Sequence, residues 1–340
     1  MRLRLANFVV AVFAVCAIPA SAAPKDSKLI SMVPPGAQIV SGFENKPNKV
    51  GGPLLMTTVN NVLDLDDLRS LSGVDPKRGF SEVIEVTFAP AGTALNEHLL
   101  LSAGKFQREA IFRAAQLNGA TSVQYLAETV LVVEPFSREK AQMKDTRWLA
   151  ILDDKIALFG TPWMVQQALN RFENRTLPDP ILMTRLALFR HDVDCWNVLT
   201  SLPRLQQNVF VQSRSPLSAL FDGAELMMVG VRFDSKVRVD FMLHASQDPA
   251  SLDVKQKADQ ISRVFAPSTA GDDAHLSPLK DLQLDEKAVR ASVVLSDEEF
   301  VSWKSGQVNR DRETIKTSLD RAKAESLHNS ALKESAQKEP

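Results

Sequence analysis

Apolar residues recur at every second position in several segments of the chain, which is the period of a β-strand with one buried face. One segment places Ile84, Val86 and Phe88 on the same face, and a second, residues 99–103, follows after a loop that contains Pro90. Two such segments joined by a loop predict a β-hairpin. Further hairpins are predicted over 224–244 and 279–295, and strands over 123–133 and 148–159, the latter broken by polar residues at 153–155.

Other segments carry apolar residues three or four positions apart, the spacing of one face of an α-helix. Residues 106–118 show it, with Ala114 and Leu117 on the predicted buried face. Thr161 followed by Pro162 predicts the start of another helix, because threonine caps free backbone amides and proline has no amide to satisfy. The other predicted helices are residues 64–71, residues 248–265, a helix starting at the capping box of Ser296 and Glu299, and a weakly amphipathic helix from Ser305.

A proline-rich stretch separates two segments that show the same succession of hairpins and helices. Residues 152–156 (LDDKI) and 284–288 (LDEKA) are similar, and each lies at the corner of the last hairpin before a helix. We therefore expect an α+β fold of two similar units of antiparallel β-hairpins with helices packed on one face. The expected boundaries are 1–22 for a signal peptide, 23–175 for unit A, 176–222 for a linker, 223–304 for unit B and 305–340 for a polar C-terminal helix and tail.

The first 22 residues predict a cleavable secretory signal. Arg2 and Arg4 precede an apolar run at 8–18, and the small residues 20–22 predict cleavage near Ala22/Ala23. The apolar run is shorter than the roughly 20 residues that span a bilayer, and no later stretch is long enough. We expect a periplasmic or secreted, soluble mature chain with no transmembrane segment after cleavage.

The chain has two cysteines, and one of them lies inside the predicted signal. A lipoprotein signal would place Cys16 at the modified position, but Val15 stands where a small residue is expected. After cleavage Cys195 alone remains, so the mature chain forms no intrachain disulfide. Its neighbour Trp196 and the apolar residues that follow predict a core position for this thiol.

Composition and charge exclude several classes of protein. Lys and Arg number 40 against 41 Asp and Glu, and 44% of residues are hydrophobic. Nucleic-acid binding usually shows as a basic excess, and disorder as a low apolar fraction with high net charge. We expect an ordinary globular protein without a nucleic-acid partner.

Seven short segments of unit A form a recognisable set. They are TTVNN at 57–61, DLDD at 64–67, SGVDP at 72–76, HLL at 98–100, SAGKF at 102–106, RWLAIL at 147–152 and FGT at 159–161. The set resembles a family of exported bacterial proteins of unknown function, and the resemblance weakens in unit B. It implies a soluble exported α+β protein, and it implies no activity, substrate or catalytic residue.

The cluster at 191–195 holds imidazole, carboxylate and thiolate groups, which are the usual metal ligands. In a strand, His191 and Cys195 share one face while Asp192 and Asp194 share the other, so the four do not converge. No second cluster completes a coordination sphere. We predict no metal site and no cofactor.

Motifs for catalysis have simpler explanations. Acidic pairs at 66–67, 153–154 and 285–286 suggest the two carboxylates of a glycosidase, but the first lies at a helix start and the others at hairpin corners. Ser-x-x-Lys occurs at 137–140 and 277–280 without the companion motifs of penicillin-recognising enzymes. We favour a protein without catalytic activity, and the sequence leaves catalysis undecided.

The strongest candidate for a binding site is one face of the strand 237–244. Arg238, Asp240 and His244 project together from it at two-residue steps, and Arg290 on a later strand can join them. Such a face binds a polar or anionic ligand or another protein, or it is a solvated sheet face. The leading hypothesis is a non-catalytic exported binding or interaction protein of the bacterial cell envelope, whose partner is another envelope protein or a small polar ligand. The alternative is a periplasmic hydrolase with dispersed catalytic residues.

Overall fold

The computed structural model describes residues 27–44, 80–88, 97–133, 146–189, 193–200, 224–245, 279–284 and 288–301. The strands are β1 (Ile39–Glu44), β2 (Phe80–Phe88), β3 (Glu97–Gly104), β4 (Thr121–Tyr125), β5 (Glu128–Val133), β6 (Arg147–Leu152), β7 (Ile156–Gly160), β8 (Cys195–Thr200), β9 (Ala224–Phe233), β10 (Val237–Ala245), β11 (Leu279–Leu284) and β12 (Ala288–Leu295). The helices are α2 (Lys28–Met32), α6 (Arg108–Leu117), α7 (Pro162–Glu173) and α8 (Pro180–Leu186), and a helical turn follows at 297–301.

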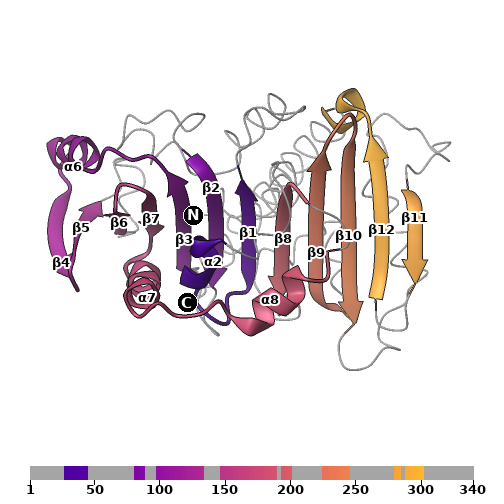
Figure 1. Cartoon of the computed structure of the whole chain (residues 1–340), viewed down its shortest axis with the longest axis horizontal. Coiled ribbons are helices and arrows are strands. Elements are labelled where there is room, and N and C mark those ends of the chain that lie inside the picture. The colour runs from indigo at the N-terminus through magenta and orange to yellow at the C-terminus, as the bar shows by residue number, and fades with distance from the viewer. Residues whose placement is uncertain are drawn as a thin grey trace, which may run out of the picture.

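All twelve strands belong to one antiparallel sheet, in the order β11-β12-β10-β9-β8-β1-β2-β3-β7-β6-β5-β4 (Figure 1). The predicted α+β class of two similar units is therefore wrong. The described chain is mostly antiparallel sheet with few helices, and β1 pairs with β8 so that one sheet runs through both predicted units. Periodicity indicates which face of a strand is buried, but it does not indicate which distant strands pair.

Helices pack against both faces of the sheet, which also corrects the expectation of one covered face. Met164 and Val165 of α7 are buried in one core cluster, together with residues of α2 and α8. Ile111 and Ala115 of α6 are buried in the cluster on the opposite face. We call the first face the α7 face; its sheet residues include Val40, Ile84, Leu99, Leu101, Leu158, Trp196, Met228 and Met242.

Several predicted elements are confirmed. β2-β3, β9-β10 and β11-β12 are antiparallel hairpins, as the alternation predicted. Asp153 and Asp154 form the corner between β6 and β7 in the left-handed conformation, with φ of 49° and 53°, which suits a tight hairpin turn. Ser296 and Glu299 form the predicted capping box, because the Ser296 amide donates to the Glu299 carboxylate and the Glu299 amide to the Ser296 hydroxyl. Cys195 is buried, as expected.

Other predictions are wrong in detail. Residues 123–133 are not one strand, because a turn at Leu126, with φ of 54°, divides them into β4 and β5. The buried face of α6 is Ile111 and Ala115, while Leu117 is exposed. Thr161 precedes α7 but makes no capping bond through its side chain. The predicted signal and the helices over 64–71, 248–265 and beyond 304 lie outside the described residues.

Residues 176–222, the predicted linker, contribute both α8 and β8. β8 lies near the centre of the sheet, between β1 and β9. All six of its residues are buried, so both of its faces are covered.

Arg171 of α7 connects this helix to α2 and to the segment after α7. Its Nε donates to the carbonyl oxygen of Ser31 at 2.7 Å, and its Nη2 donates to the carbonyl oxygen of Leu177 at 2.7 Å. Burial lowers the pKa of Arg171, and Asp179 opposes that shift.

Strand order is the same on the two sides of the β1-β8 pair. Moving outward, one half of the sheet runs β1-β2-β3-β7-β6 and the other β8-β9-β10-β12-β11. The similar sequences at 152–156 and 284–288 thus join equivalent strand pairs, β6-β7 and β11-β12. The two rows of directly opposed residues are Ser41, Glu85, Leu100 and Phe159 on one side and Asn197, Val229, Phe241 and Ala291 on the other. Internal duplication stays a prediction, but these rows define equivalent positions in the two halves.

Candidate functional site

The predicted polar face of β10 is present on the α7 face of the sheet. Every second residue of β10 is buried on the opposite face, namely Val237, Val239, Phe241 and Leu243. Because side chains alternate along a strand, the other residues of this stretch point toward the α7 face: Arg238, Asp240, Met242 and His244. The register of β12 adds two further residues, since Arg290 pairs with Met242 and Ser292 with Asp240.

Asp240 and Arg290 line one pocket of about 100 Å³. Met228, Met242 and Ser292 come from the sheet, and Leu188 and Phe189 come from the segment that follows α8. The complete lining is Leu188, Phe189, Met228, Asp240, Phe241, Met242, Gln283, Arg290, Ala291 and Ser292.

Each charged side chain in the pocket is held by a neighbour. The Ser292 hydroxyl donates to Oδ1 of Asp240, and the Arg238 Nε lies 3.8 Å from the same oxygen. Nη1 of Arg290 donates to the carbonyl oxygen of Leu188 at 3.3 Å. Within the described residues Asp240 contacts Ser292 and Arg238, so the two charges lining the pocket are separately anchored.

The wall of the pocket lies close to the sheet because of a glycine. A Cβ at Gly230 would lie 2.5 Å from Cγ1 of Val193 and 3.0 Å from Cε1 of Phe189. Both distances are shorter than normal carbon contacts. Gly230 therefore lets the segment after α8 pack directly on β9, which positions Phe189 and Leu188 at the pocket.

The four predicted site residues are not all brought together. Asp240 and Arg290 share the pocket, and Arg238 lies beside Asp240. His244 is four residues from Asp240, about 13 Å along the strand at about 3.3 Å per residue. Its Nδ1 lies 3.5 Å from Oε1 of Glu225 instead.

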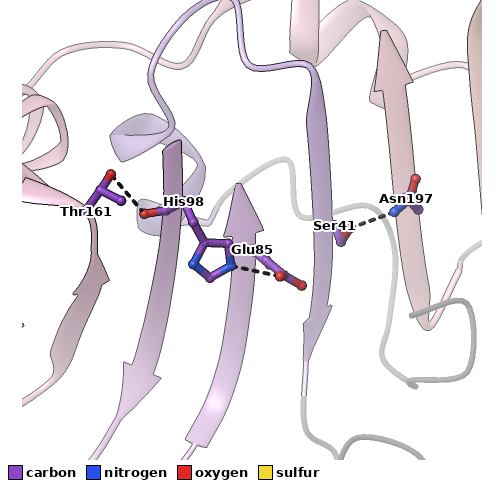
Figure 2. Close-up of polar contacts among 5 residues, drawn as sticks. All are labelled: Ser41, Glu85, His98, Thr161 and Asn197. Atoms are coloured by element: carbon purple, nitrogen blue, oxygen red, sulfur yellow. Dashed lines mark hydrogen bonds and ion pairs between the residues drawn. The ribbon is translucent and has the colours of Figure 1, made fainter. Parts of the chain in front are cut away.

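A second polar cluster crosses the middle of the opposite face (Figure 2). Nδ2 of Asn197 donates to the Ser41 hydroxyl at 2.7 Å, and Nε2 of His98 lies 2.8 Å from Oε1 of Glu85. The Thr161 amide donates to the carbonyl oxygen of His98 at 2.9 Å. The Thr161 hydroxyl lies 3.5 Å from the same oxygen, and it donates to the carboxylate of Glu97. Asn197 is fully buried and Ser41 nearly so.

This cluster contains the residue types of a hydrolytic triad but not its contacts. In a triad the histidine accepts the proton of the serine hydroxyl, and the acid holds the other side of the imidazole. Here the Ser41 hydroxyl accepts from Asn197, and His98 contacts Glu85. We interpret the cluster as a set of polar bonds between neighbouring strands. The sequence did not predict this cluster, although each of these strands carries a polar residue at a position that faces the core.

Among the described residues, no group of three or more His, Cys, Asp and Glu side chains is placed to hold a metal ion. Asp194 does not point to such a site, because its Oδ2 accepts from the amide of Phe233 at 2.5 Å. His191 and Asp192 lie outside the described residues. In the part of the chain described, no helix has the length and apolar character to cross a membrane.

The fold and the pocket define an antiparallel β-sheet protein that carries a small, mixed-charge pocket on its α7 face. Comparisons with protein-family models, curated proteins and solved structures give no match to this chain. The pocket and the surface around it are the described features that bear on function.

Proposed function

We propose that this chain is a non-catalytic binding or interaction protein of the bacterial cell envelope. The observation that carries the proposal is the pocket in which Asp240 and Arg290 stand on a sheet, each anchored by a neighbour. Side chains that are held in place on regular strands offer a ligand a fixed binding geometry, and this lowers the entropic cost of binding. The signal predicted at 1–22 supports export to the periplasm or beyond.

Equivalent positions in the other half of the sheet support the same proposal. Leu99 takes the place of Asp240, and Leu158 takes the place of Arg290. Both leucines are fully buried in the cluster that contains α7. Charged residues at the matching positions of β10 and β12 contribute nothing to an apolar core, so we attribute them to recognition.

The test is affinity capture from periplasmic extract with the full mature chain. Asp240→Leu combined with Arg290→Leu removes both charges of the pocket, and Arg113→Leu on the exposed surface of α6 is the matched control. We expect a reproducible partner with the wild type and the control, and its loss with the double variant. Capture unchanged by the double variant, or turnover in a broad hydrolase screen, contradicts the proposal.

A further inference from the structure

The size of the pocket limits what enters it. Ligand pockets for small molecules are usually about 300–1,000 Å³, and one water takes about 30 Å³. A volume of about 100 Å³ therefore matches one chemical group or one side chain. On a protein partner, such a group anchors the interface by filling a central pocket.

Two charged side chains line the pocket, Asp240 with acceptor atoms and Arg290 with donors. Both contacts of Asp240 within the described residues use Oδ1, which leaves Oδ2 as an acceptor. Arg290 lines the same pocket, and a guanidinium carries only donors. A ligand group that uses both charged side chains donates to the carboxylate and accepts from the guanidinium.

The charges of the pocket favour a neutral group. A carboxylate entering it meets Asp240, and an ammonium meets Arg290 and the nearby Arg238. Met228, Met242 and Phe189 form much of the remaining lining, and burial of a charge against apolar surface costs far more than burial of a hydrogen-bonded neutral group. A primary carboxamide is neutral, with an N–H₂ donor and a carbonyl acceptor on one carbon.

We propose that this pocket binds the side-chain carboxamide of a glutamine or asparagine on a partner polypeptide. The amide N–H₂ donates to Oδ2 of Asp240, and the amide oxygen accepts from Arg290. The methylenes of glutamine contact Met228 and Met242, whose flexible thioethers adapt to the shape of a ligand. The inference rests on the proposed function, because it names the group that the binding face recognises.

The experiment uses the full mature chain with ¹³C-labelled methionine methyl groups. Peptides of the form acetyl-Gly-X-Gly-amide, with X as Gln, Glu, Lys or Leu, are titrated while the methyl signals of Met228 and Met242 are followed. All four peptides share the same backbone amides, so differences between them report the side chain. Each methionine signal is assigned from its loss in Met228→Leu or Met242→Leu.

We expect the Gln peptide to shift both methyl signals saturably and to bind at least about fivefold more tightly than the other three. Asp240→Asn and Arg290→Gln should each weaken its binding by about tenfold, the usual effect of losing one charge-assisted hydrogen bond. Arg113→Gln on α6 should leave it unchanged. The methyl signals of the other methionines show whether each variant keeps the native fold.

Equal or tighter binding of the Glu, Lys or Leu peptide overturns the inference, and so does the absence of a saturable shift with the Gln peptide. The two proposals fail differently. If the carboxamide inference alone is wrong, the double leucine variant still loses the captured partner. If the proposed function is wrong, capture does not depend on the pocket at all.

Discussion

The α7 face of the sheet has two different surfaces on the two sides of the β1-β8 pair. On β3 and β7, Leu99 and Leu158 are fully buried in the cluster formed with α2 and α7. On β10 and β12, the equivalent Asp240 and Arg290 line a pocket, and the carboxylate-bearing side chain is 20% exposed. Because strand order is the same in both halves, the difference comes from what covers the strands. A position under a helix is occupied by an apolar side chain, whereas a position beside a pocket tolerates a charged one.

The comparison is tested most severely by placing a charged side chain at a buried position of the apolar half. Leu158→Asp puts a carboxylate at a fully buried position among apolar side chains. We expect the free energy of unfolding to fall by more than about 4 kcal/mol, because the charge loses water without gaining a partner. Urea unfolding measures it, with Leu158→Met as the control. A loss below about 1 kcal/mol in the free energy of unfolding would show that α7 does not exclude water from Leu158.

Weakening the cover of β3 and β7 should cost somewhat less. Leu169 is buried on α7, so Leu169→Ala removes apolar contacts and leaves a cavity. We expect a loss of about 2–5 kcal/mol in the free energy of unfolding. Leu177→Ala, at an exposed position after α7, should stay within about 0.5 kcal/mol. Similar effects for the two variants would contradict the assignment of α7 as the cover.

Gly230→Ala tests the wall of the pocket in the other half. The new methyl group would overlap Val193 and Phe189, so the segment after α8 must shift away from β9. We expect a loss of about 1–3 kcal/mol from overpacking, together with weaker binding to the captured partner. Thermal unfolding and the capture assay report the two effects. If the variant keeps full stability and full binding, the close packing of this segment on Gly230 does not position Phe189.

Asp240→Leu should have the smallest effect on stability. The carboxylate is partly exposed, and its loss removes one bond from Ser292. We expect the free energy of unfolding to change by less than about 1.5 kcal/mol, in contrast with the large cost of a carboxylate at the buried Leu158. Urea unfolding measures it. A loss as large as that of Leu158→Asp would make Asp240 a structural residue, not a binding one.

The sequence predicted the parts of this picture that depend on local periodicity. Alternation along residues 237–244 predicted the hairpin, the buried face and the shared direction of Arg238 and Asp240, because side chains on a strand alternate regardless of distant partners. Arg290 followed for the same reason, since its strand also alternates.

Pairing between distant segments was not predictable in this way. β8 carries buried residues on both faces, so its sequence shows no alternation. Its partner β1 lies far away in the chain, and Asn197 and Ser41, which are opposed in the two strands, are 156 residues apart. Phe189 was also missed, because its position depends on how the segment after α8 packs on Gly230.

The most direct test of the difference between the two halves is thiol labelling at equivalent positions. Arg290→Cys and Leu158→Cys are made in the chain without residues 1–22, the predicted signal, which contain Cys16. The native Cys195 is buried and serves as an internal reference. We expect the thiol introduced by Arg290→Cys to react at least about a hundredfold faster than the thiol introduced by Leu158→Cys. The thiol introduced by Leu158→Cys should react only when the protein unfolds locally or globally, and we expect the same of Cys195. Equal rates for the two introduced thiols would contradict an accessible pocket on β10 and β12.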